Sequence, residues 1–149
     1  MIVLLILIFG VIEVSWAVYS YHLVANAAHE GARYAMVRGN SWAPASCDGS
    51  GSAGSGWTSS RCIASSADIA NYVANRSLPG VAINASNVCV QYFATVPAST
   101  STTCTPGGTA NSQGNIVQVT VSYPFTLNVV FLPPKTISIS STSQMIIAQ

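Results

Sequence analysis

The sequence predicts an α+β fold in which a long N-terminal helix packs on a three- or four-stranded antiparallel sheet, with a short second helix beside it. Three observations lead to this prediction. No proline occurs before Pro44, and the chain up to that point is apolar or amphipathic. Later segments alternate apolar and polar residues, as strands with one buried face do. One segment, 66–77, has helical spacing behind a serine that can cap it.

The first helix is expected to run from Ile2 to Val37, about 50 Å at 1.5 Å per residue. Residues 1–12 (MIVLLILIFGVI) are apolar throughout and are followed by Glu13. That run spans about 18 Å, which is short of the roughly 30 Å hydrocarbon core of a membrane. Three aromatic residues of the kind that favour the membrane interface come next: Trp16, Tyr19 and Tyr21.

Small residues mark the second half of this helix. Ala28 and Ala32, and likewise Gly31 and Ala35, are spaced four apart, which places each pair on one helix face. Small side chains let two backbones approach closely. We therefore expect the helix to pack against the sheet through these four residues.

Glu13 is an isolated carboxylate among aliphatic side chains, which is costly in a membrane or a dry core. One interpretation is a paired charge that sets the register between neighbouring helices. Its partner would be a free N-terminal amine or an arginine of another subunit. The other interpretation is a carboxylate solvated at the lipid headgroup boundary, and both remain open at this stage.

Composition restricts the function classes. Charged residues make up 6% of the chain and the net charge is +1, so no basic surface for nucleic acid is expected. A polar surface of Ser, Thr, Asn and Gly suits a protein held in an assembly outside the cell. No paired carboxylates and no nucleophile–base constellation are visible, so we expect no catalytic residues, no cofactor and no enzyme.

The four cysteines predict two disulfides, for which three pairings are possible. We favour Cys47–Cys62 and Cys89–Cys104, because each pair brackets one loop rich in Gly, Ser or Thr. Closing a loop of about 15 residues contributes roughly 3 kcal/mol in the chain-entropy model. No metal site is expected, since there is no CxxC motif and neither histidine lies near a cysteine in sequence.

The loop between residues 40 and 60 carries Trp42 and Trp57 at its flanks. These rings either bind a sugar or a surface, or pin the loop onto the core. The loop itself is rich in Gly and Ser, so it is not expected to form a helix or a strand.

Four elements are expected after this loop. A short helix should span 66–77, with Ser65 or Ser66 as its N-cap and Asp68 in its first turn. The predicted strands are Asn87–Phe93, Val117–Tyr123 and Lys135–Ile147. Pro124 should end regular pairing or lie at an edge. In the last strand, Ile137 and Ile139 are expected to face inward. The apolar connection 127–134 is either an interface or part of the core.

Three segments stand out as motifs: FGVIEV at 9–14, NAAHEGARYA at 26–35 and the strand segment IVQVTVSYPF at 116–125. They resemble the TadE-like pilin and pseudopilin family. The family typically shows an aliphatic run, a G-I-I-E-F-like step and an N-A-A-R-E-G-A-R-Y-A-like stretch. The resemblance covers the first ~40 and the last ~40 residues, and the helix motif is the more specific of the two.

The resemblance implies a pilin-like fold and a role in the tight-adherence (Tad) branch of type IV pilus-like systems. The chain would be cut by a prepilin peptidase and drawn from the inner membrane into an extracellular filament built from copies of itself and related pilins. Family members usually carry an acidic residue about five positions into the mature chain, where Leu5 stands here. The mature start therefore differs from Met1, or Glu13 takes that role.

On this interpretation residues 1–24 form the apolar membrane and filament-core half of the helix. Residues 25–149 form the head, which includes the second half of the helix. The expected function is a structural subunit for surface adherence. Two alternatives are a minor pseudopilin that initiates or caps the filament and a membrane-anchored adhesin that binds through its loop tryptophans.

Overall fold

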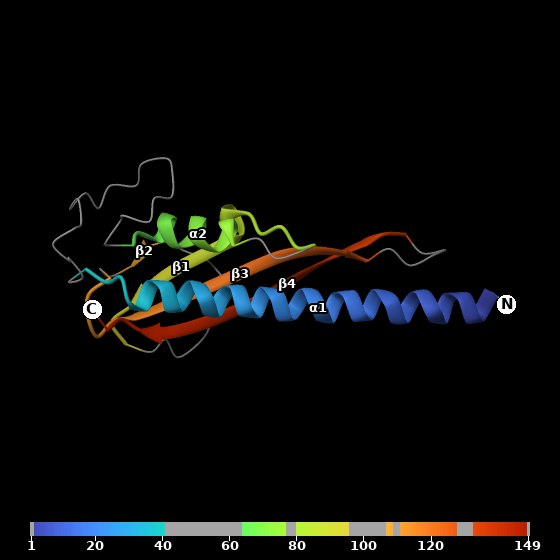
Figure 1. Cartoon of the computed structure of the whole chain (residues 1–149), viewed down its shortest axis with the longest axis horizontal. Helices are drawn as coiled ribbons and strands as arrows, with labels where there is room; N and C mark the ends of the chain where they lie inside the picture. Colours follow the sequence, from blue (N-terminus) through green and yellow to red (C-terminus); the bar gives the residue numbers. More distant parts are fainter. Residues whose placement is uncertain are drawn as a thin grey trace.

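The structure is a computed structural model that describes residues 2–40, 64–76, 80–95, 107–108, 111–127 and 133–148, with only the backbone described at Ile2 and 107–108. It is organised as two layers, with both helices on one face of a four-stranded sheet (Figure 1). Five predicted site residues lie outside the described residues: Trp42, Cys47, Trp57, Cys62 and Cys104.

Helix α1 (Ile2–Met36) is one continuous 35-residue helix, which confirms the predicted first element. It carries the N-terminus at one end of the molecule and reaches the head at the other (Figure 1). The C-terminal end of the chain holds the far end of this helix, because the Ala148 amide donates to the Met36 carbonyl at 3.1 Å. That contact satisfies one of the carbonyls that a helix end leaves unpaired.

Helix α2 (Ser66–Asn75) confirms the predicted short helix and identifies Ser65 as its N-cap. The Asp68 amide donates to the Ser65 hydroxyl oxygen at 3.2 Å, and the Ser65 amide donates to the Asp68 carboxylate at 3.1 Å. This reciprocal capping box satisfies two backbone donors at the helix start. Asp68 is buried beside the cap.

The sheet order is β2-β1-β3-β4, with β1 (Val88–Phe93), β2 (Gly107–Gly108), β3 (Ile116–Leu127) and β4 (Lys135–Ile146). A 3-10 turn, η1 (Ala85–Asn87), leads into β1. The three strands β1, β3 and β4 pair antiparallel and confirm the predicted sheet. The fourth strand differs from the prediction, because the two-residue β2 pairs parallel to β1.

The β3–β4 ladder is longer than predicted and passes straight through Pro124. Pairing is continuous from Ile116 opposite Ile146 to Leu127 opposite Lys135, with Pro124 opposite Ser138. Of the two alternatives predicted for Pro124, an end of regular pairing is not found, and a position at an edge is. Strand β1 covers β3 only as far as Val121, so Pro124 lies where β3 has an open side within the described sheet. A residue without an N–H donor is tolerated at such an edge.

We call residues 122–127 and 135–140, which pair with each other beyond the reach of β1, the arm. The arm extends beside the N-terminal half of α1 (Figure 1). Ile137 shares the inward strand face with Ile139 as expected, but its side chain remains 47% exposed. Ile139 packs against the core, whereas Ile137, on the same strand face and opposite the buried Phe125, lies one step nearer the end of the ladder.

The core fills the space between α1, α2 and the helix-facing side of the sheet. Its centre is made of fully buried small and β-branched residues: Val24, Ala28, Ala32, Ile69, Val90, Val117, Val119 and Val121. Gly31 lies where three elements meet. A Cβ atom on it would come within 2.7 Å of Val73 Cγ2 in α2 and 3.2 Å of Val119 Cγ1 in β3.

Candidate functional site: the exposed half of α1 and the Glu13 groove

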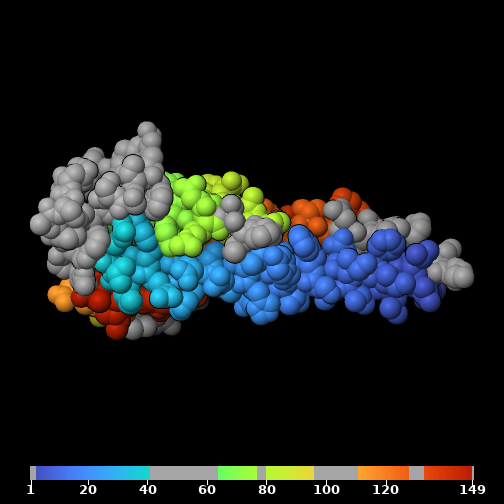
Figure 2. Space-filling view, in the orientation of Figure 1, coloured from blue at the N-terminus to red at the C-terminus, as the bar shows by residue number. Residues whose placement is uncertain are grey.

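The N-terminal half of α1 presents apolar side chains on all sides. Ten large apolar residues between 3 and 14 are 40–79% exposed: Val3, Leu4, Leu5, Ile6, Leu7, Ile8, Phe9, Val11, Ile12 and Val14. In the space-filling view this half of the helix runs along the lower edge of the right-hand part of the molecule (Figure 2). A surface of this kind marks a contact with lipid or with protein.

The helix is long and apolar enough to cross a membrane, judged by its length and composition. A core helix of a soluble protein and a signal sequence pass the same test. Only 6% of its most apolar 18-residue window is buried, which separates it from a core helix.

Aromatic residues lie at the junction between the apolar run and the head. The rings of Trp16 and Tyr19 are 5.4 Å apart and tilted by 31°, and Tyr21 meets His22 edge-on at 6.0 Å. Such amphipathic rings are favoured at membrane–water interfaces.

Glu13 lies on the face of α1 that turns toward the sheet. It shares a helical stripe with Ala17, Ser20 and Val24, of which the last two are fully buried. Glu13 itself is half-buried, whereas the side chains immediately before and after it are 56% and 61% exposed. Among the described residues it makes no hydrogen bond and no ion pair. The structure therefore places an uncompensated carboxylate on an otherwise apolar or small-residue stripe.

A groove of about 820 Å³ opens beside this carboxylate, lined by Val11, Ile12, Glu13, Ser15, Trp16, Tyr19 and Gly80. Gly80, which follows α2, closes one side of it. Its φ of +86° is in the left-handed region, and a Cβ atom there would lie 2.9 Å from Cη2 of Trp16. Gly80 and its contact with Trp16 were not predicted. Pro79-Gly80 indicates a turn in the sequence, but not its distant partner.

We expect Gly80→Ala to destabilise the head by about 2 kcal/mol, because it combines left-handed backbone strain with a clash against the Trp16 ring. Gly114→Ala is the matched control, since Gly114 has φ +87° and nothing within 4 Å of the new Cβ atom. Thermal unfolding of the full chain in detergent measures both variants. Equal losses would mean that the Trp16 contact contributes nothing beyond backbone strain.

The four small residues named from the sequence are all buried at the junction of α1 with the rest of the head. Ala28, Ala32 and Ala35 are fully or almost fully buried, and Gly31 makes the close approaches described above.

A stack of two tyrosines and two arginines joins α1 to α2 and was not predicted. The rings of Tyr34 and Tyr72 are 4.1 Å apart and nearly parallel, with Arg38 over the first ring at 4.5 Å and Arg76 over the second at 5.3 Å. Each arginine follows its tyrosine by four residues, a spacing that puts both on one helix face. That spacing is visible in the sequence, but the pairing between the two helices is not.

Cys89 in β1 is disulfide-bonded. Its partner lies outside the described residues, so both pairings, Cys47–Cys62 and Cys89–Cys104, remain predictions. Within the described ranges no three His, Cys, Asp or Glu residues come together in an arrangement that could hold a metal ion.

Comparison with known proteins gives a family match for the first part of the chain. Residues 1–33 match the family model described as TadE-like protein. The curated proteins and the solved structures contain no match to the chain. The matched segment includes the apolar run, Glu13 and most of the small-residue band, and it bears out the resemblance of the N-terminal helix inferred from the sequence. Over residues 1–33, the chain is therefore similar to the TadE-like family.

Proposed function

We propose that the chain is a pilin, a structural subunit that polymerises through the apolar half of α1 into an extracellular Tad-type filament for surface adherence. The TadE-like segment and the apolar helix fit a pilin or pseudopilin associated with a Tad pilus. The observation that carries the finer proposal is the exposure of ten large apolar side chains on a helix whose other half is built into a folded head.

The ten exposed apolar side chains of α1 are energetically favourable only where lipid or protein covers them. Fully burying one large aliphatic or aromatic side chain contributes about 1.5–3 kcal/mol, so exposing ten of them to water is strongly unfavourable. We propose that the inner membrane covers them before assembly and that the helices of other copies or related pilins cover them afterwards. The outer Ser- and Thr-rich face of β4 would then remain at the surface.

Electron microscopy of material sheared from cells that make the chain tests this proposal. Regular filaments composed mainly of this chain are the expected result. Recovery only at filament tips or in the membrane would instead favour the minor pseudopilin. A monomeric ectodomain that binds sugar and forms no filament would contradict both and favour the adhesin.

Glu13 is proposed to act in assembly, where its charge restricts which helix registers are allowed. We expect Glu13→Ala and Glu13→Leu to leave the protein in the membrane and to reduce its incorporation into filaments by about tenfold or more, because the charge no longer selects one register. Quantitative blotting of sheared and membrane fractions measures the change. Glu30→Ala is the control, as Glu30 lies in the head end of the same helix and pairs with Arg33 at 3.7 Å. Normal filament yield from both Glu13 variants would refute the role.

A further inference from the structure

The arm carries a single charged residue, Lys135, and it belongs to the strand face that turns toward α1. Side chains two positions apart on a strand point to the same side. Lys135 therefore shares its side with Ile139, which packs against the core under α1. Lys135 pairs with Leu127 in the last register position described for the ladder. The arm thus presents its lysine toward the helix.

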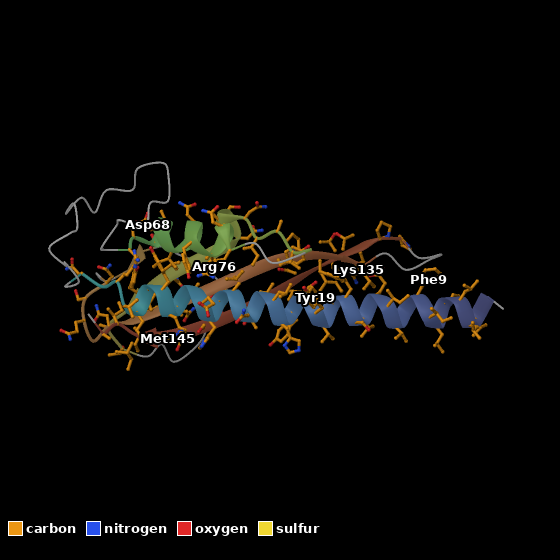
Figure 3. All side chains as sticks on the ribbon, viewed as in Figure 1. Phe9, Tyr19, Asp68, Arg76, Lys135 and Met145 are labelled. Carbon is orange, nitrogen blue, oxygen red and sulfur yellow. The ribbon has the colours of Figure 1, made fainter. Side chains whose placement is uncertain are left out.

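The position of Lys135 along the axis of α1 can be estimated from the place where β3 and α1 approach closely. Val119 of β3 lies beside Gly31, and β3 runs from there toward the N-terminal half of the helix. Leu127 is eight residues further on, about 26 Å along the strand. The same length corresponds to about 18 residues of α-helix, and counting back from Gly31 leads to Glu13. Figure 3 agrees, since Lys135 lies between the levels of Phe9 and Tyr19.

Glu13 lies on the face of α1 that is turned toward the arm. The carboxylate lies on the sheet-facing stripe of α1, and it is half-buried while its neighbours in sequence are more exposed. The arm and the helix therefore bring their opposite charges to one level and turn them toward each other. Both side chains are long, and the lysine stem is flexible.

We infer that Lys135 is the counter-charge of Glu13 within one chain, and that the two pair when the apolar half of α1 leaves water. In the structure the pair is open, and Arg33–Glu30 is the one ion pair within 4.0 Å among the described residues. An exposed pair gains little, because solvent screens it and both side chains lose freedom. In lipid or in a packed helix bundle the attraction grows and an unpaired charge becomes costly.

The other cations of the described residues are engaged elsewhere. Arg33 pairs with Glu30, while Arg38 and Arg76 cover the rings of the tyrosine stack at the head end. Lys135 is the described cation at the level of the apolar half. Closing the pair would hold the arm on the helix and let the Glu13 carboxylate enter a low-dielectric environment with its charge compensated. This inference rests on the proposed function, because that function supplies the lipid or filament environment. It assigns the partner of Glu13 to the same chain rather than to another subunit.

Carbodiimide coupling in membrane vesicles from cells that make the full chain tests the pairing before any filament forms. The reagent joins a carboxylate to a contacting amine as an amide with loss of water. We expect peptide mass spectrometry to find a Glu13–Lys135 amide in chains that run as monomers. Lys135→Arg keeps the charge but removes the reactive amine, so it should abolish the amide and preserve filament yield. A Glu13–Lys135 amide found only between chains, or no amide at all, would overturn the inference.

Charge variants give a second readout in filaments. We expect Glu13→Gln and Lys135→Gln each to lower filament yield about tenfold, because each leaves one charge unpaired in the assembly. The exchange Glu13→Lys with Lys135→Glu should restore most of the yield. Full yield from Lys135→Gln beside a defect in Glu13→Gln would overturn the inference and assign the partner to another copy, which leaves the proposed function standing. Absence of filaments from the unaltered chain would contradict the proposed function, while the coupling experiment still decides the pair.

Discussion

A Gly31→Val substitution is expected to lower the free energy of unfolding by about 3 kcal/mol, at the upper end of overpacking costs. A Cβ atom at this position would already lie 2.7 Å from Val73 Cγ2 and 3.2 Å from Val119 Cγ1. Both neighbours are buried and β-branched, so they have few alternative rotamers into which to move. The helix must therefore shift away from α2 and β3, which opens the core. Chemical denaturation of the full chain in detergent measures the loss.

Gly10→Val is the control for this prediction, because Gly10 lies in the same helix and nothing lies within 4 Å of an added Cβ atom. Replacing a helical glycine should there leave stability unchanged or raise it by up to about 0.5 kcal/mol. Gly31→Ala should fall between the two, since it adds the clashing Cβ atom but gains helix propensity. A stable Gly31→Val variant would mean that α1 does not approach α2 as closely as described.

Raising the pH through the range from 10 to about 12 is expected to destabilise the head by about 2–3 kcal/mol through Tyr92 alone. Burial raises the pKa of Tyr92 from 10.0 to about 12, and the negative charge of Asp68 adds to the shift. The folded state favours the neutral phenol, whose hydroxyl donates to the Ala64 carbonyl at 3.4 Å. Neutral Tyr92 contributes its full stabilisation below pH 10, the pKa of this tyrosine in the unfolded chain. That stabilisation is lost as the pH rises through about 12, its pKa in the folded chain.

Tyr92→Phe should remove this part of the alkaline loss at little cost near neutral pH, because the hydrogen bond it deletes is long. The measurement is the free energy of unfolding at pH 8 and pH 12 in the unaltered chain and the variant. Tyr21→Phe is the control, since the Tyr21 side chain is 51% exposed. An alkaline loss that is equally large in Tyr92→Phe would show that other groups cause it.

The candidate site was predictable where it depends on residues close in sequence. The apolar run, Glu13 and the aromatic residues after it are consecutive in one helix, so their order on its surface follows from helical geometry. The partners of that surface were not predictable. Gly80 lies 64 positions from Trp16, and Lys135 lies 122 positions from Glu13, and no local pattern links the members of either pair.

The sequence by itself determined the elements whose causes are local. These are α1, through an unbroken run without proline; α2, through a serine N-cap with Asp68 in the first turn; and three strands, through alternation of apolar and polar residues. Only the tertiary structure decided the parallel pairing of β2, the passage of the ladder through Pro124, the exposure of Ile137 and the position of Lys135 between the levels of Phe9 and Tyr19. Each of these features depends on which distant segment packs over a given position. Strand pairing and helix packing across the whole core determine that segment, and residues adjacent in sequence do not.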